Sequence, residues 1–123
     1  FVAILTIGLF EFKYYRSISK TQNVQTEFIL NNIGEPTEDT VFTAMNVQHL
    51  SWTVLPYYFP DNAVYACMPD EVKEDADHIW TFLGNDISES TLNTMKTKGY
   101  LVDEYKTVLM CKYSCNVYHF YRE

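Results

Sequence analysis

Apolar and polar residues alternate over several stretches of the chain, and this alternation predicts β-strands. Residues 21–30 show the pattern most clearly. One face of that segment carries Val24, Thr26, Phe28 and Leu30, and the other carries Gln25 and Glu27. Because successive side chains of a strand point to opposite faces, a period of two indicates a half-buried strand. The Asn, Gly and Pro content of residues 31–39 then predicts a turn, which leads into a second strand over residues 40–48.

Further strands are predicted in the middle of the chain. A third strand is predicted over residues 49–55, in which Trp52 and Val54 would lie on the same face. An aromatic strand is predicted over residues 57–68, an acidic turn over residues 69–77 and another strand over residues 78–84. A last apolar run follows at residues 107–113, and the tail over residues 116–123 is aromatic and charged.

One helix is predicted late in the chain, over residues 89–98. Ser88 is a suitable N-cap, because its hydroxyl can accept a hydrogen bond from the free N–H groups of the first turn. Glu89 lies at the positive end of the helix dipole, and Lys96 and Lys98 lie at the negative end. Gly99 can adopt the left-handed conformation that ends a helix. A helix of about ten residues is marginal alone, so it must pack against a sheet.

Residues 1–10 (FVAILTIGLF) are almost wholly apolar. Ten residues are too few to span a bilayer. Two interpretations remain, the hydrophobic stretch of a secretory signal or a buried first strand, and we favour the strand. The sequence begins with Phe rather than Met, which is typical of a trimmed or partial chain.

These elements predict a mostly β fold, an antiparallel up-and-down β-barrel with one C-terminal helix packed outside. At 123 residues the chain is long enough for one domain, which we place over residues 1–123. A barrel of about eight strands can hold one small ligand. The side chains that would line its cavity are Phe28, Phe42, Trp52, Val54, Tyr58 and Tyr65.

Charge and motifs restrict the function. A net charge of −7 argues against nucleic acid and against anionic membrane surfaces, and leaves a cationic ligand open. Neither a nucleophile elbow nor a phosphate-binding glycine loop occurs, so we expect no catalytic residues. Cysteines spaced Cys-x-x-x-Cys and three scattered histidines make a weak zinc site, and the acidic turn lacks the spacing of a calcium loop. We therefore expect no metal site.

Three cysteines allow three single pairings, and each pairing leaves one thiol over. Cys111 and Cys115 are close in sequence, and Cys67 is distant from both. A disulfide from Cys67 to the tail would tie the end of the chain to the sheet and would imply an oxidising compartment.

Several segments between residues 57 and 115 resemble lipocalins. The run DNAVYAC (residues 61–67) looks like the late-barrel strand of that family, HIWTFL (residues 78–83) resembles the last barrel strand, and ISESTL (residues 87–92) is similar to the start of the helix outside the barrel. Lys98-Gly99-Tyr100 and Cys115 match the helix exit and the terminal cysteine of arthropod-type members. The family's Gly-x-Trp motif is absent, and Leu83 stands where an arginine is usual, so the resemblance is to a divergent member.

The resemblance implies a secreted, extracellular carrier with a Cys67–Cys115 disulfide. Its ligand would be a small hydrophobic molecule, such as a lipid, a retinoid or a bilin-like compound, bound without covalent attachment. One alternative keeps the barrel and binds a cationic biogenic amine through acidic residues. Another is a protein-interaction or inhibitory module that has no cavity. Oligomeric state is left open.

Overall fold

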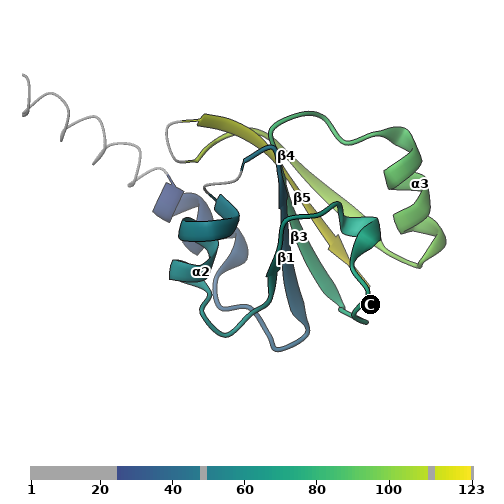
Figure 1. Cartoon of the computed structure of the whole chain (residues 1–123), viewed down its shortest axis with the longest axis horizontal. Coiled ribbons are helices and arrows are strands. Elements are labelled where there is room, and N and C mark those ends of the chain that lie inside the picture. Colours follow the sequence, from purple (N-terminus) through teal and green to yellow (C-terminus); the bar gives the residue numbers. More distant parts are fainter. Residues whose placement is uncertain (1–24, 48–49, 111–112, 123) are drawn as a thin grey trace, which may run out of the picture.

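The computed structural model describes residues 25–47, 50–110 and 113–122 (Figure 1). Residues 25–28 are α-helical. The elements that follow are η1 (Ile29–Ile33), β1 (Thr40–Met45), η2 (Leu50–Val54), α2 (Leu55–Tyr58), β2 (Val64–Tyr65), η3 (Pro69–Glu71), β3 (His78–Leu83), α3 (Glu89–Thr97), β4 (Leu101–Met110) and β5 (Tyr113–Tyr121). Here η1 and η2 are π-helical, and η3 is a 3₁₀ turn. The strand predicted over residues 1–10 lies outside the described residues.

The strands form one mixed sheet in the order β2-β1-β3-β5-β4. β1 runs parallel to both β2 and β3, with Phe42 opposite Val64 on one side and Trp80 on the other. β5 runs antiparallel to both β3 and β4, and a bulge interrupts β4 between Tyr105 and Val108. Among the described residues β2 and β4 are the two edge strands, and the sheet does not close on itself. The predicted antiparallel barrel is therefore wrong.

The parallel strands explain why no barrel forms. Parallel neighbours need a crossover connection, whereas antiparallel neighbours can be joined by a tight hairpin. The crossover from β1 to β2 contains η2 and α2, and the connection from β2 to β3 contains η3. The chain thus uses helical segments where alternation had predicted a run of hairpins.

The first of these differences concerns residues 21–30, predicted as a strand. Residues 25–28 are α-helical and continue into η1. Ile29, which breaks the alternation, is 1% exposed, whereas Leu30, which fits it, is 65% exposed. Because Gln25 and Ile29 are both buried four positions apart, the buried face follows the helical period.

The second difference concerns residues 49–55 and 57–68, also predicted as strands. Residues 50–58 are helical, and only Val64–Tyr65 of the later segment is a strand. Val54 and Leu55 are adjacent and both buried, and so is Phe59 four positions after Leu55. Such spacing suits a helix and not a strand. Pro56, at the start of α2, lies where a helix tolerates proline.

Three predicted elements are confirmed. The strand over residues 40–48 appears as β1, the strand over residues 78–84 as β3, and the helix over residues 89–98 as α3. The Ser88 hydroxyl accepts a hydrogen bond from the Thr91 N–H at 3.2 Å. Gly99 has a φ of 93°, the left-handed conformation expected at the end of a helix.

Both faces of the sheet are covered, which gives three layers (Figure 1). We call the face beneath η1, η2 and α2 the η1/α2 face and the opposite one the α3 face. On the η1/α2 face, Phe42, Trp80 and Phe82 pack with Ile29, Val54, Leu55 and Phe59. On the α3 face, Val41, Ile79 and Phe120 pack with Met95 and Tyr100. Burial on both sides is typical of parallel strands.

The N-cap gives a first testable prediction. Replacing Ser88 with alanine removes the acceptor for the Thr91 N–H, so we expect the free energy of unfolding to fall by about 1 kcal/mol. Urea unfolding followed by circular dichroism would measure the loss. Ser90→Ala is the matched control, because Ser90 is an exposed position inside α3. An equal loss in both variants would contradict the prediction.

In the described part of the chain, no helix combines the length and the apolar character needed to cross a bilayer.

Candidate ligand-binding cleft

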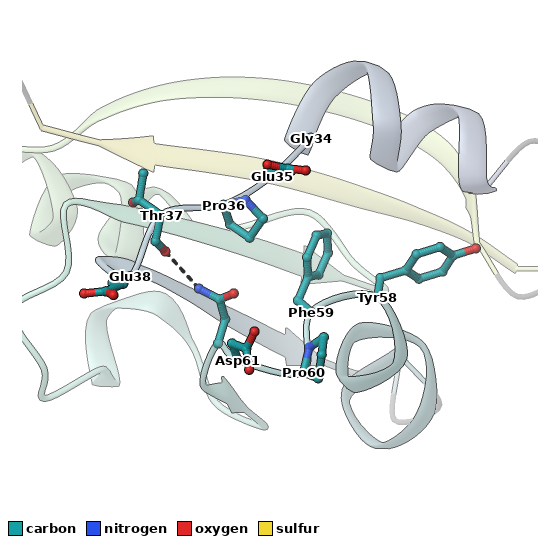
Figure 2. Close-up of a pocket in the computed structure, with 10 residues that line it drawn as sticks. Gly34, Glu35, Pro36, Thr37, Glu38, Tyr58, Phe59, Pro60 and Asp61 are labelled. Carbon is teal, nitrogen blue, oxygen red and sulfur yellow. Dashed lines mark hydrogen bonds between the residues drawn. The ribbon is translucent and has the colours of Figure 1, made fainter.

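A cleft of about 590 Å³ opens where two loops meet beside the η1/α2 face (Figure 2). One loop joins η1 to β1, and the other joins α2 to β2. The first loop contributes Gly34, Glu35, Pro36, Thr37 and Glu38. The second loop, together with the end of α2, contributes Tyr58, Phe59, Pro60, Asp61 and Asn62. This volume lies within the range of small-molecule sites, about 300–1,000 Å³.

Asn62 fixes the two walls to each other. Its side-chain N–H group donates to the Thr37 carbonyl at 2.9 Å, the dashed line in Figure 2, and to the Thr40 carbonyl at 3.1 Å. Gly34 has a φ of 63° and turns the chain out of η1, where its N–H donates to the Ile29 carbonyl at 2.8 Å. The loop walls are therefore held by hydrogen bonds to defined backbone positions.

Two aromatic rings from the end of α2 line the cleft. Phe59 is 4% exposed, and its ring stacks on Phe42 of β1 with centroids 4.5 Å apart. Tyr58 is half-buried, and its hydroxyl hydrogen bonds with the Thr26 hydroxyl at 2.7 Å. Figure 2 shows the Phe59 ring rising toward Pro36 and the Tyr58 ring extending to one side. Phe59 is thus anchored to the sheet and Tyr58 to the helix at residues 25–28, so this part of the cleft is rigid.

The charged side chains of the cleft are all acidic. Glu35, Glu38 and Asp61 are exposed, and neither lysine nor arginine is among the lining residues in the described part of the chain. At neutral pH three carboxylates carry negative charge, and the faces of aromatic rings also attract cations. The cleft is therefore electrostatically suited to a positively charged ligand.

The carboxylates are not arranged as a chelating metal centre. Within residues 25–47, 50–110 and 113–122, no three or more His, Cys, Asp and Glu side chains are placed so that they could hold a metal ion. Chelation of Ca²⁺ would require several carboxylate oxygens at 2.3–2.6 Å from one point. Separated carboxylates beside aromatic rings better match a cation that carries an organic group.

The six predicted ligand contacts do not gather around one cavity. Phe42 and Val54 are buried in the core, and Phe28 packs against that core with its ring edge-on to Tyr105 at 5.5 Å. Trp52 is 76% exposed, and Tyr65 lies on the edge strand β2 with its hydroxyl bonded to Glu74. Of the six, Tyr58 alone lines the cleft. The open sheet provides no barrel interior for the others to line.

Sequence reasoning did not identify Glu35, Glu38 and Asp61 as site residues. Glu35 and Glu38 lie in the turn predicted over residues 31–39, and Asp61 lies in a turn inside the segment 57–68 that alternation predicts as a strand. The sequence did contain a usable signal, because Glu35 and Glu38 precede an apolar segment and Asp61 follows an aromatic one. Only the parallel pairing of β1 and β2 brings the two turns together.

The predicted Cys67–Cys115 disulfide does not form in this structure. Cys67 follows β2, whereas Cys115 is buried on β5 beneath the η1/α2 layer. Three strand spacings separate β2 from β5, which amounts to roughly 14 Å. A disulfide needs Cα atoms within about 7 Å. Burial raises the pKa of the Cys67 thiol, and the negative charges of Glu71, Asp70 and Glu74 raise it further.

The likeness of residues 61–67, 78–83 and 87–92 to lipocalin segments stays a prediction. Comparison of the chain with protein-family models, with curated proteins and with solved structures finds no match.

Proposed function

We propose that the protein binds a small organic cation, an amine attached to an aromatic or apolar group, in the cleft beside the η1/α2 face. One observation carries the proposal: Glu35, Glu38 and Asp61 line a cleft of about 590 Å³ that has aromatic walls, and none of the described residues that line it is basic. Binding is non-covalent, and the protein acts by sequestering or carrying the ligand.

The magnitudes are those of a modest binding site. An exposed ion pair contributes about 0.2–1 kcal/mol, and an ammonium over an aromatic face contributes about 0.5–2 kcal/mol. Burial of an apolar group against the more accessible Tyr58 and Pro60 adds about 25 cal/mol per Å². Since association itself costs at least about 4 kcal/mol, we expect dissociation constants on the order of 0.1–1 mM.

A cationic ligand fits the cleft better than a fully hydrophobic ligand for two reasons. The open sheet provides no closed barrel interior in which a fully apolar molecule could be surrounded. The cleft instead brings carboxylates to its rim, and a neutral ligand placed there would displace their water without compensating their charge. An amine compensates that charge directly.

Isothermal titration calorimetry with three indole probes tests the proposal. Tryptamine is cationic, tryptophol is its neutral counterpart and indole-3-acetate is anionic. We expect tryptamine to bind, tryptophol to bind at least about fivefold more weakly and indole-3-acetate not to bind, because the probes differ mainly in charge. Raising NaCl from about 50 to 500 mM should weaken tryptamine binding. Equal binding of tryptamine and tryptophol would refute a cation site.

Charge-neutralising variants locate the site. Glu38→Gln combined with Asp61→Asn removes two of the three carboxylates and should weaken tryptamine binding about four- to tenfold. Glu104→Gln is the matched control, because Glu104 is an exposed carboxylate on β4, outside the cleft. If the double variant and the control bind tryptamine equally, the ligand is held elsewhere.

A further inference from the structure

Two histidines on neighbouring strands hydrogen bond to each other. The Nδ1 atom of His78, the first residue of β3, lies 3.0 Å from the Nε2 atom of His119 on β5. One of these nitrogens must carry a hydrogen and the other must be bare, so at least one of the two rings is neutral. If both rings were protonated, two N–H groups and two positive charges would face each other, and the contact would become repulsive.

The His119 ring is held in a stack of aromatic side chains and cannot easily turn away. It lies parallel to the Trp80 ring, with centroids 4.1 Å apart and an interplanar angle of 5°. The rings of His78 and Tyr121 lie 5.2 and 5.1 Å from it. Trp80 is itself 4% exposed. A proton added to His119 therefore enters a partly dehydrated stack and not open solvent.

The charged and titratable groups around His119 come from three strands. His78 of β3 is hydrogen bonded to it, Asp103 of β4 is its register partner, and Tyr121 is on its own strand β5. Burial lowers the pKa of His119 to about 4, and the charge of protonated His78 contributes, while Asp103 acts in the opposite direction. The balance of these groups opposes charging His119.

A second set of contacts, which we call the Arg122 latch, joins the end of β5 to the segment before β3. The Arg122 guanidinium forms ion pairs with Asp75 and Asp77 and donates to the Ala76 carbonyl at 2.9 Å. Its backbone N–H donates to the Asp77 carbonyl at 3.0 Å. The guanidinium also lies 4.7 Å from the centre of the Tyr100 ring. Because Asp77 immediately precedes His78, the latch and the histidine pair hold the same end of the sheet.

We propose that the His78–His119 pair is an acid-sensitive joint: when both rings become protonated, the end of β5 separates from the start of β3 and the Arg122 latch opens. The opening is local, because the rest of this strand pair runs through buried residues. These include Ile79, Phe82, Val117 and Tyr118. The joint is formed by β3 and β5, whereas the cleft is formed by the loops that precede β1 and β2. This inference therefore does not depend on the proposed ligand.

Proton linkage determines the direction in which pH changes the stability of the closed joint. In the unfolded or locally opened chain a histidine titrates near its ordinary pKa of about 6.5. The pKa of His119 in the closed joint is about 4. The opened state therefore binds more protons between these values, so the closed state is favoured in full above about pH 6.5 and loses that advantage as the pH falls toward 4.

Backbone amide exchange followed by NMR tests the joint. Between about pH 7 and pH 4.5, after correction for the intrinsic exchange rate, we expect protection of the Arg122 amide, which donates to the Asp77 carbonyl, to fall at least about tenfold. Protection of the Phe82 and Val117 amides should change much less. A fall of equal size at all three amides would mean global acid unfolding and would overturn a local joint.

Two variants assign the effect to the pair. His119→Gln removes the partly buried ring and retains a side chain that can hydrogen bond, so the acid-induced loss should shrink to about twofold or less. His78→Gln removes the repulsion between the two rings but leaves His119 partly buried, so it should reduce the acid-induced loss in part. His49→Gln, which removes a histidine elsewhere in the sequence, should respond like the unaltered protein. If His119→Gln fails to fold because the stack on Trp80 is lost, His78→Gln still decides. An unchanged acid response in His78→Gln would refute the proposal.

Discussion

Replacing Phe42 with alanine should lower the free energy of unfolding by about 3–5 kcal/mol, the range measured for large-to-small changes in protein cores. Phe42 is fully buried at the centre of the parallel part of the sheet, between β2 and β3. Its ring stacks on Phe59, so the substitution removes an aromatic pair as well as apolar area. A domain of this size has only about 5–15 kcal/mol of stability, so the loss would be a large fraction of it.

Urea unfolding monitored by circular dichroism measures this effect. Tyr57→Ala is the control, because that ring is 79% exposed, and an exposed position should cost about 0.5 kcal/mol or less. Phe42→Leu should fall between the two variants, since it keeps most of the apolar volume. A loss for Phe42→Ala no larger than for Tyr57→Ala would show that this ring is not part of the core.

Substitution of Phe42 should also affect the candidate site. Phe59 lines the cleft and is supported from below by Phe42. Under conditions in which Phe42→Leu remains folded, we expect weaker tryptamine binding, because the Phe59 ring loses its flat partner and gains rotational freedom. A rigid site of this kind depends on residues that never touch the ligand.

Elements with local signals were predicted from the sequence. The start of α3 depends on Ser88 and its end on Gly99, and both signals act within one turn of the chain. β1 and β3 were recognisable because each is a short run of apolar and β-branched residues between turns. Near-continuous burial along both strands fits their place inside the sheet.

The helices over residues 25–33 and 50–58 were not predicted, and the reason is physical. Alternation over a few residues can coincide with a helical period, and here two buried neighbours, Val54 and Leu55, carried the helical signal. That error decided the topology. A helical crossover between β1 and β2 makes the two strands parallel, whereas a hairpin would have made them antiparallel.

The candidate site depends on the same topology. Glu38 and Asp61 are far apart in sequence and lie in turns with little pattern of their own. They line one cleft because the parallel strands β1 and β2 begin at the same end of the sheet, and the two loops lead into the strands at that end. A sequence analysis that misses the crossover therefore cannot place these carboxylates together.

The buried hydroxyl pair of Thr43 and Thr81 should show strong energetic coupling. These residues are register partners on β1 and β3, both are fully buried, and their hydroxyl oxygens are 2.8 Å apart. Thr43→Val keeps the shape of the side chain but leaves the Thr81 hydroxyl without this partner. A buried polar group that loses its hydrogen bond costs about 1–3 kcal/mol, so each single variant should be destabilised by that amount.

The double variant distinguishes a hydrogen-bonded pair from two independent contributions. With both residues changed to valine, no hydroxyl is left unpaired and two methyl groups meet inside an apolar layer, so the protein should recover to within about 1 kcal/mol of the original stability. The resulting coupling energy, on the order of 1–3 kcal/mol, is measured by urea unfolding of the four proteins. Thr97→Val, at an exposed position of α3, controls for the substitution itself. Additive losses would mean that each hydroxyl is satisfied by its own strand, in which case the seam between β1 and β3 is held by apolar packing and backbone hydrogen bonds alone.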